Sequence, residues 1–133
     1  MNQLSQLEPQ NVFRFFEEIS QIPRPSYHEK QISDYLVTFA KERNLEVYQD
    51  SHYNVIIIKE ASEGYESAAP LILQGHMDMV CEQDSTSSIN MEQEGLELAV
   101  DGDEIYAKGT TLGADDGIAV AYALALLDSS TLQ

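Results

Sequence analysis

The sequence predicts an α/β layer fold in which helices cover most of the sheet. Three observations support this prediction. Segments with a helical spacing of apolar residues interleave with strand-like segments along the chain. Two of the strand-like segments, 55–58 and 71–73, are apolar throughout, as expected of strands covered on both sides. The 133 residues contain neither an internal repeat nor a linker, and this length suits a single domain.

Three segments are predicted to be helical. The first, 9–21, has apolar residues at helical spacing and begins with a proline, which fits the first turn of a helix. The second follows Ser26 and Glu29, which form a capping-box pattern, and carries an apolar stripe over 32–40. The third, 117–127, is almost entirely apolar, so we expect it to be buried.

Five segments are predicted to be strands. The segments 45–49 and 54–59 are joined by a short polar turn, which favours a hairpin. The segments 96–100 and 105–107 flank an Asp-Gly pair, which tolerates positive φ and is also typical of hairpins. The segment 71–73 is expected to begin a buried strand that runs on into a polar segment with a histidine.

The charge of the chain excludes two classes of partner. Asp and Glu total 23 against 7 Lys and Arg, which gives a net charge of −16. From Glu60 to Gln133 there are 15 acidic residues and one basic residue, Lys108, so this part carries −14 (15 − 1 = 14). Nucleic acids and anionic membranes both bind cationic surfaces, so neither is expected as a partner. Most of these carboxylates are expected to form solvated surface.

Three features bear on the cellular compartment. No apolar run approaches the roughly 20 residues that a membrane span requires. The first residues have neither the basic start nor the apolar centre of a signal peptide. Cys81 is the single cysteine, which excludes an internal disulfide and fits a reducing environment. The sequence therefore predicts a cytoplasmic protein.

The segment His76-Met77-Asp78 is the first candidate for chemistry. It follows the predicted strand 71–73, and the carboxyl ends of strands are where open α/β sheets usually hold ligands. Alternation along a strand would place His76 and Asp78 on the same side. Imidazole is a common zinc ligand, and a carboxylate bonded to its other nitrogen fixes the tautomer. Taken alone, the tripeptide is explained better by an ordinary histidine at a strand end beside an acidic residue, and it is the position after the strand that favours a functional site.

The second candidate is the glycine-flanked pair Asp115 and Asp116. Gly113 and Gly117 permit an unusual turn around two carboxylates, directly before the third predicted helix. One aspartate suffices to cap a helix, so two in succession suggest a bound cation. A capping function alone remains the alternative.

Other candidates are weaker. His28 and His52 are expected at the surface, and Cys81 is expected to be a buried, unreactive thiol, because no basic neighbour would lower its pKa. Ser26 is accounted for by its predicted capping function.

Taken together, the two segments resemble the M20 family of metallopeptidases. In that family a His-x-Asp segment supplies a zinc ligand and a helper aspartate, and a later Gly-x-Asp-Asp/Asn-x-Gly turn supplies an aspartate that bridges two metals. The segments 22–29, 75–80 and 108–117 resemble the aminoacyl-histidine dipeptidase branch of the family. The resemblance extends over nearly the whole chain.

The resemblance implies a fold, a reaction and a set of residues. It implies a three-layer zinc-peptidase-like catalytic domain with a mixed sheet flanked by helices, of which residues 1–133 form the N-terminal portion. It implies metal-dependent hydrolysis of dipeptides, either Xaa-His or a broad range, with two zinc ions that cobalt or manganese could replace. His76 and Asp115 would be metal ligands, Asp78 would orient His76, and the bond between Asp115 and Asp116 would be cis.

The resemblance also implies that essential parts lie elsewhere. The family completes its site with a Glu-Glu pair, whose first member is the general base, a further acidic residue and a distant His. All follow the bridging aspartate, and none lies in the 18 residues after Asp115 (133 − 115). The lid domain, through which complete enzymes are expected to form homodimers, is absent too. This chain alone is therefore expected to be inactive. The alternatives are an M20-type deacylase or carboxypeptidase, and a non-catalytic truncated fragment.

Overall fold

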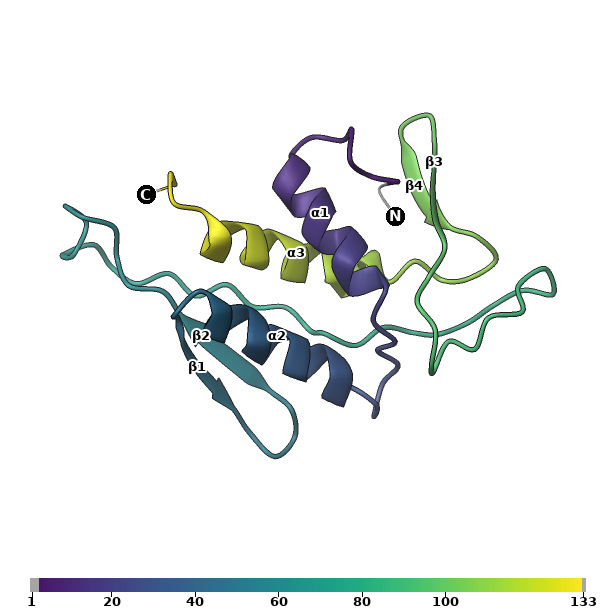
Figure 1. Ribbon diagram of the computed structural model, residues 1–133, viewed down its shortest axis with the longest axis horizontal. Coiled ribbons are helices and arrows are strands. Elements are labelled where there is room, and N and C mark those ends of the chain that lie inside the picture. Colours follow the sequence, from purple (N-terminus) through teal and green to yellow (C-terminus); the bar gives the residue numbers. More distant parts are fainter. Residues whose placement is uncertain (1–2, 133) are drawn as a thin grey trace.

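The computed structural model describes residues 3–132, which form a small α/β structure (Figure 1). Each of the two sheets is an antiparallel hairpin: β1 pairs with β2, and β3 pairs with β4. The prediction of an α/β fold is therefore confirmed, whereas a mixed sheet does not occur within residues 3–132. The elements are α1 (Gln10–Ser20), α2 (Lys30–Glu42), β1 (Glu46–Gln49), β2 (Val55–Ile58), β3 (Leu98–Asp101), β4 (Glu104–Ala107) and α3 (Ala114–Asp128).

The core lies between α1 and α3, which pack against each other. The helical spacing of apolar residues in α1 buries Phe15, Phe16 and Ile19 almost completely. From α3, Ala121 and Leu124 are buried in the same core. The opposite side of α3 is not covered, because Tyr122 is 48% exposed and Leu126 is 40% exposed. The expectation that this helix is buried is therefore correct for one side of it and wrong for the other.

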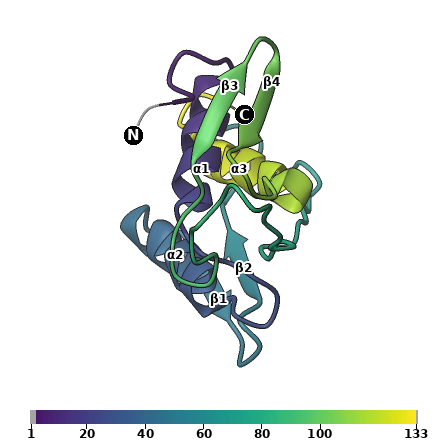
Figure 2. The ribbon, with the colours of Figure 1, turned by 90° about the vertical axis from the view of Figure 1, so that its right-hand side faces the viewer.

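The helix α2 packs against the hairpin β1–β2 and belongs to the same core, because the ring of Phe39 meets that of Phe15 edge-on with centroids 5.5 Å apart. The hairpin β1–β2 lies on the other side of the molecule from β3–β4 (Figures 1 and 2). Val55 and Ile57 pack against the core, whereas Ile56 is 60% exposed. Alternation along β2 therefore buries only one of its faces. The prediction that both faces are covered is wrong for the described residues.

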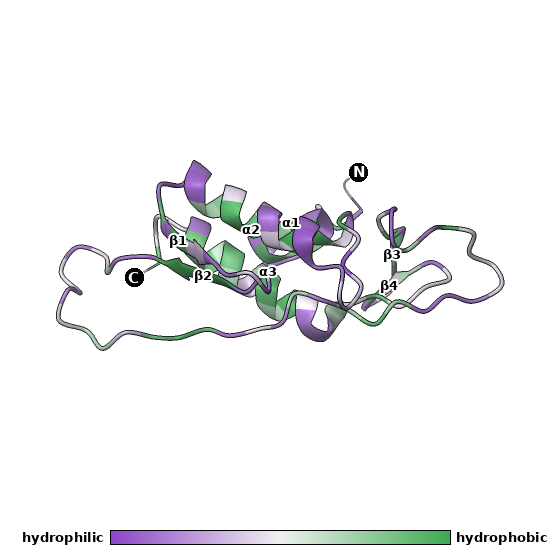
Figure 3. Cartoon of the chain, turned by 90° about the horizontal axis from the view of Figure 1, so that it is seen from below, coloured by the Kyte–Doolittle hydropathy of each residue, from purple (hydrophilic) through white to green (hydrophobic). Residues whose placement is uncertain are grey.

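The segment 71–73 differs most from its predicted state. It forms no strand, and Leu71, Ile72 and Leu73 are 82%, 88% and 53% exposed. Figure 3 shows it as a hydrophobic run on the long extended connection along the edge of the molecule. A strand requires a neighbour that pairs with its backbone N–H and C=O groups, and no segment within residues 3–132 pairs with this one.

The start of α2 also differs from the prediction. The helix begins at Lys30, and neither Ser26 nor Glu29 caps it with a side chain. Tyr27 has φ 70°, a left-handed conformation that a right-handed helix does not contain. The Glu29 carboxylate accepts a hydrogen bond from the Tyr27 backbone N–H instead. The capping-box prediction is therefore wrong.

Two further findings concern the peptide bond at the start of α3 and the length of the helices. The peptide bond between Asp115 and Asp116 at the start of α3 is cis, as the resemblance implies. Among the helices that the structure describes, none has the length and apolar character needed to cross a membrane.

Candidate metal centre

The loop that carries His76 lies against the first turns of α3. A Cβ atom built on Gly75 would lie 2.9 Å from Asp116 Oδ2 and 3.2 Å from the Ala119 side chain, so only glycine allows this approach without movement. The backbone N–H of His76 donates to Asp116 Oδ2 at 3.3 Å. Asp116 thus holds the His76 loop rather than capping the helix, for which no side-chain hydrogen bond is present.

His76 lies between the other two predicted site residues. Its Nε2 is 3.0 Å from Asp115 Oδ1, and its Nδ1 is 3.0 Å from Asp78 Oδ1. Two ligands of one zinc ion are expected to be about 3–4 Å apart, since each bond is near 2.0–2.2 Å. The structure therefore brings together the three residues that the sequence singled out, although the function of each stays a prediction.

Charge stabilises this arrangement. Both ring nitrogens of His76 face carboxylate oxygens, so the protonated ring can donate two hydrogen bonds. The hydrogen bond with Asp115, followed by contacts with Asp78, raises the pKa of His76. A metal that binds Nε2 must displace the proton from that atom. The site is open to solvent, because the side chains of His76 and Asp115 are 53% and 95% exposed.

Asp78 is held on its other side by Ser26. Ser26 Oγ donates to Asp78 Oδ2 at 2.5 Å, while Asp78 Oδ1 faces the His76 ring. The hydrogen bond from Ser26 is the main reason that the pKa of Asp78 is lowered, and the contacts with His76 act in the same direction. Each carboxylate oxygen of Asp78 therefore has a protein partner.

Arg24 connects the two loops that carry the site. Its guanidinium is buried and donates to the carbonyl oxygens of Met77 at 3.1 Å and Gly113 at 2.9 Å. Burial away from water lowers the pKa of Arg24. Gly113 has φ 72°, and a Cβ atom there would lie 2.7 Å from Arg24 Nη2. Sequence reasoning missed Arg24, because its partners are distant backbone carbonyls that leave no local pattern.

The residues fit a metal by donor type but do not complete a site. An imidazole nitrogen and a carboxylate oxygen at 3.0 Å are suitable zinc donors, and the hydrogen bond at Nδ1 leaves Nε2 for a metal. Within residues 3–132, however, no group of three or more His, Cys, Asp and Glu side chains could hold a metal. Catalytic zinc ions usually have three protein ligands each.

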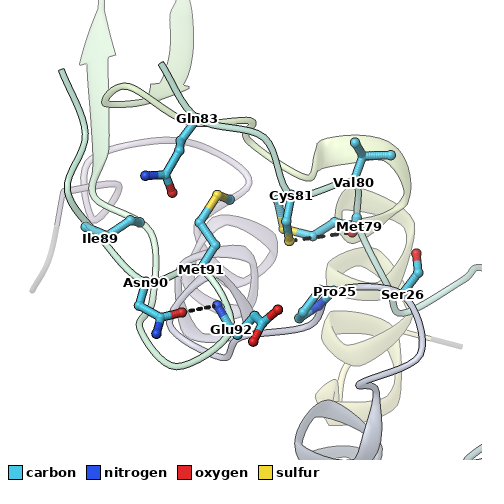
Figure 4. Close-up of a pocket in the computed structure, with 10 residues that line it drawn as sticks. All are labelled: Pro25, Ser26, Met79, Val80, Cys81, Gln83, Ile89, Asn90, Met91 and Glu92. Carbon is cyan, nitrogen blue, oxygen red and sulfur yellow. Dashed lines mark hydrogen bonds between the residues drawn. The ribbon is translucent and has the colours of Figure 1, made fainter. Parts of the chain in front are cut away.

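A hollow of about 660 Å³ is lined by Met79, Val80 and Cys81, which come directly after the His76–Asp78 segment in the chain (Figure 4). Ser26 and Val80 lie on one side of it, and Met91 lies across it, on the loop before β3. Cys81, which also lines the hollow, is partly buried rather than fully buried, and desolvation raises the pKa of its thiol. An unreactive thiol is thus consistent with the structure. His28 and His52 are exposed, as predicted.

Comparison with known proteins gives close matches over a limited part of each relative. The chain is 42% identical over 127 residues to the cytosol non-specific dipeptidase of Escherichia coli strain K12, which covers 96% of the chain and 26% of that protein. The chain is homologous to part of this dipeptidase. No protein-family model matches it.

The structure agrees with the sequence match. The crystal structure of aminoacylhistidine dipeptidase from Vibrio alginolyticus matches with a TM-score of 0.93 and 40% sequence identity, over 97% of the chain and 26% of that structure. The resemblance to this branch of dipeptidases is therefore confirmed. The chain spans about a quarter of the length of the two dipeptidases, 26% of each.

Proposed function

We propose that the chain is the N-terminal, metal-binding portion of a zinc-dependent dipeptidase of the M20 family. The observation that carries this proposal is the 3.0 Å separation of His76 Nε2 and Asp115 Oδ1, with Asp78 bonded to the other ring nitrogen of His76. Homology to a cytosol non-specific dipeptidase, at 42% identity, supports dipeptides as the substrate class and the cytoplasm as the location.

The residues of this chain would act mainly by binding and orienting. His76 Nε2 would hold one metal, and Asp115, whose carboxylate has two oxygens, would bridge two. Asp78 would keep the proton of His76 on Nδ1, which leaves the lone pair of Nε2 directed at the metal. The chemistry that two bound zinc ions supply is Lewis-acid activation of water and of the substrate carbonyl. Cobalt or manganese could replace zinc.

We place residues 1–133 in a three-layer catalytic domain whose mixed sheet is completed by sequence outside this chain. The exposed apolar segment 71–73 supports this assignment, because it is extended and has the composition of a buried strand. The general base, the other ligands and a lid domain that forms homodimers would also lie outside it. By itself this chain would then be inactive.

A chimera tests the proposal. In it, this chain replaces the matching quarter of the E. coli dipeptidase, to which it is 42% identical. We expect the chimera to hydrolyse dipeptides, including Xaa-His dipeptides, and to lose this activity when a chelator removes metal. The isolated chain should show no activity above background. Because the E. coli dipeptidase supplies the rest of the chimera, a deacylase or a carboxypeptidase would be identified only with the complete parent protein of this chain, assayed on N-acyl amino acids and longer peptides.

Two variants connect the assay to the site. His76→Ala in the chimera should abolish activity, whereas His52→Ala, which removes an exposed histidine from a turn, should leave it unchanged. A folded chimera without chelator-sensitive hydrolysis would leave the non-catalytic fragment as the better explanation. The same applies if His76→Ala and His52→Ala are equally active.

A further inference from the structure

Ser26 has a contact that neither its sequence context nor the proposed chemistry requires. Its hydroxyl does not cap α2 but donates to Asp78 Oδ2 at 2.5 Å, across 52 positions of the chain. Asp78 in turn contacts His76 Nδ1 through Oδ1 at 3.0 Å, and the backbone carbonyl oxygen of Asp78 lies 3.0 Å from the same nitrogen. The side chains of Ser26, Asp78, His76 and Asp115 therefore form one continuous series of hydrogen bonds.

The backbone around Ser26 is fixed against the segment that carries Asp78. Pro25 and Met79 form a parallel β-bridge, and the Met79 backbone N–H donates to the Arg24 carbonyl at 3.0 Å. The buried Arg24 side chain adds a hydrogen bond to the Met77 carbonyl. Met77 and Met79, on both sides of Asp78, are thus connected to Arg24 and Pro25, which directly precede Ser26, so the Ser26–Asp78 contact belongs to a fixed framework.

We infer that Ser26 is a positioning residue, which selects the carboxylate orientation in which Asp78 Oδ1 supports the metal-binding form of His76. The last torsion of an aspartate is broad and roughly two-fold, so the backbone alone does not fix where its oxygens point. With Oδ2 held by Ser26, the plane of the carboxylate is set and Oδ1 is directed at Nδ1. This inference rests on the proposed function.

The expected effect is modest, because Ser26 is exposed. Water can replace a lost hydroxyl at an exposed site and keep part of the hydrogen bond. Loss of a residue that directly supports a metal ligand usually weakens metal binding about 10–100-fold. Ser26 acts one bond further out, so Ser26→Ala should weaken zinc binding by about 3–10-fold.

The test uses the full chain labelled with ¹⁵N, at neutral pH, with zinc as the probe. Four proteins are compared: wild type, Ser26→Ala, Ser26→Thr, which keeps the hydroxyl, and Ser67→Ala, which removes an exposed serine from a turn in the connection after β2. The ¹⁵N shifts of the His76 ring report the hydrogen bond at Nδ1 in the metal-free chain, with exposed His52 as an internal reference. Zinc titration, followed by the His76 signals up to millimolar zinc, gives the dissociation constant.

We expect Ser26→Ala to move the Nδ1 signal toward that of His52 and to weaken zinc binding at His76. Ser26→Thr should restore both readouts, and Ser67→Ala should change neither. If the wild type binds zinc at His76, and Ser26→Ala changes the dissociation constant by less than about twofold and leaves the ring shifts unchanged, the inference about Ser26 is overturned. The proposed metal site would then still stand. If zinc leaves the wild-type His76 signals unmoved, the proposed metal site is overturned and the inference with it.

Discussion

Gly113→Ala tests whether the close packing around Arg24 is as tight as the structure shows. Two separate effects act at this position. Gly113 has φ 72°, and a left-handed conformation costs a residue with a Cβ atom about 1–2 kcal/mol. The new Cβ atom would also lie 2.6 Å from Met79 Sδ and 2.7 Å from Arg24 Nη2. Overpacking of this kind costs about 1–3 kcal/mol, so the sum is about 2–5 kcal/mol.

Two other glycines separate these effects. Gly102 has φ 58° and nothing within 4 Å of its added Cβ, so Gly102→Ala should show only the conformational effect of about 1–2 kcal/mol. Gly117 has no positive φ, but its Cβ would lie 2.7 Å from Arg24 Nη2, so Gly117→Ala should show only the overpacking. Replacing any glycine by alanine also restricts the unfolded chain, which stabilises all three variants about equally and cancels in the comparison.

The assay is urea unfolding of the chain, followed by far-ultraviolet circular dichroism. Midpoints are compared at constant slope, because a changed slope would indicate a changed denatured or native state. We expect Gly113→Ala to be less stable than Gly102→Ala by about 1–3 kcal/mol. Equal destabilisation of these two variants would refute the reasoning, since it would mean that Met79 and Arg24 yield to the added methyl group without loss.

Three further predictions concern the site, the helix ends and the exposed apolar segment. Asp78→Ala in the chimera should weaken zinc affinity about 10–100-fold by chelator competition, and unchanged metal content would remove Asp78 from the site. Asp128 accepts hydrogen bonds from Arg14 at 3.0 Å and Arg43 at 2.7 Å, so Asp128→Asn should destabilise the chain by about 0.5–1.5 kcal/mol at neutral pH in urea unfolding. The hydrogen bond from Arg43 lowers the pKa of Asp128, so this contribution should be present above the unfolded pKa and disappear as the pH falls through the folded pKa. The exposed Asp103→Asn, as the control, should show no such loss. Leu71→Ser should change the stability of this chain by less than about 0.5 kcal/mol, because Leu71 is 82% exposed, but it should inactivate the chimera if 71–73 is an inner strand there.

The sequence predicts the local elements well, because their patterns depend on near neighbours. The predicted helix 9–21 corresponds to α1 (Gln10–Ser20), and both predicted hairpins are present. Burial of 71–73 could not be predicted correctly from composition. An apolar run indicates that a strand is stable only when both of its faces are buried. Burial also requires a neighbouring strand that pairs with it and helices that pack on the sheet. In this structure the segment has neither within residues 3–132.

In the candidate site, the residues with metal-binding side chains could be predicted from the sequence, whereas the residues that hold the loops in place could not. His76 is recognisable from the sequence because it follows an apolar run, and Asp115 because it lies between two glycines. The structure brings His76 Nε2 and Asp115 Oδ1 to 3.0 Å. The residues that hold the loops in place were not recognisable. Arg24 acts through the carbonyls of Met77 and Gly113, and any residue type offers a carbonyl.

The segment that contains Arg24 and Ser26 links the two halves of the site. The Arg24 side chain donates hydrogen bonds to both halves of the site. One goes to the carbonyl of Met77, the residue after His76, and the other goes to the carbonyl of Gly113, two residues before Asp115. A buried guanidinium without a carboxylate at hydrogen-bond distance is costly, and its Nε has no partner among the described residues. Burial of this guanidinium is tolerated only if its remaining N–H groups donate hydrogen bonds of good geometry, as they do to Met77 and Gly113. Movement of either loop away from Arg24 would leave a buried donor unpaired, so the burial that makes Arg24 costly also favours the arrangement in which His76 and Asp115 meet.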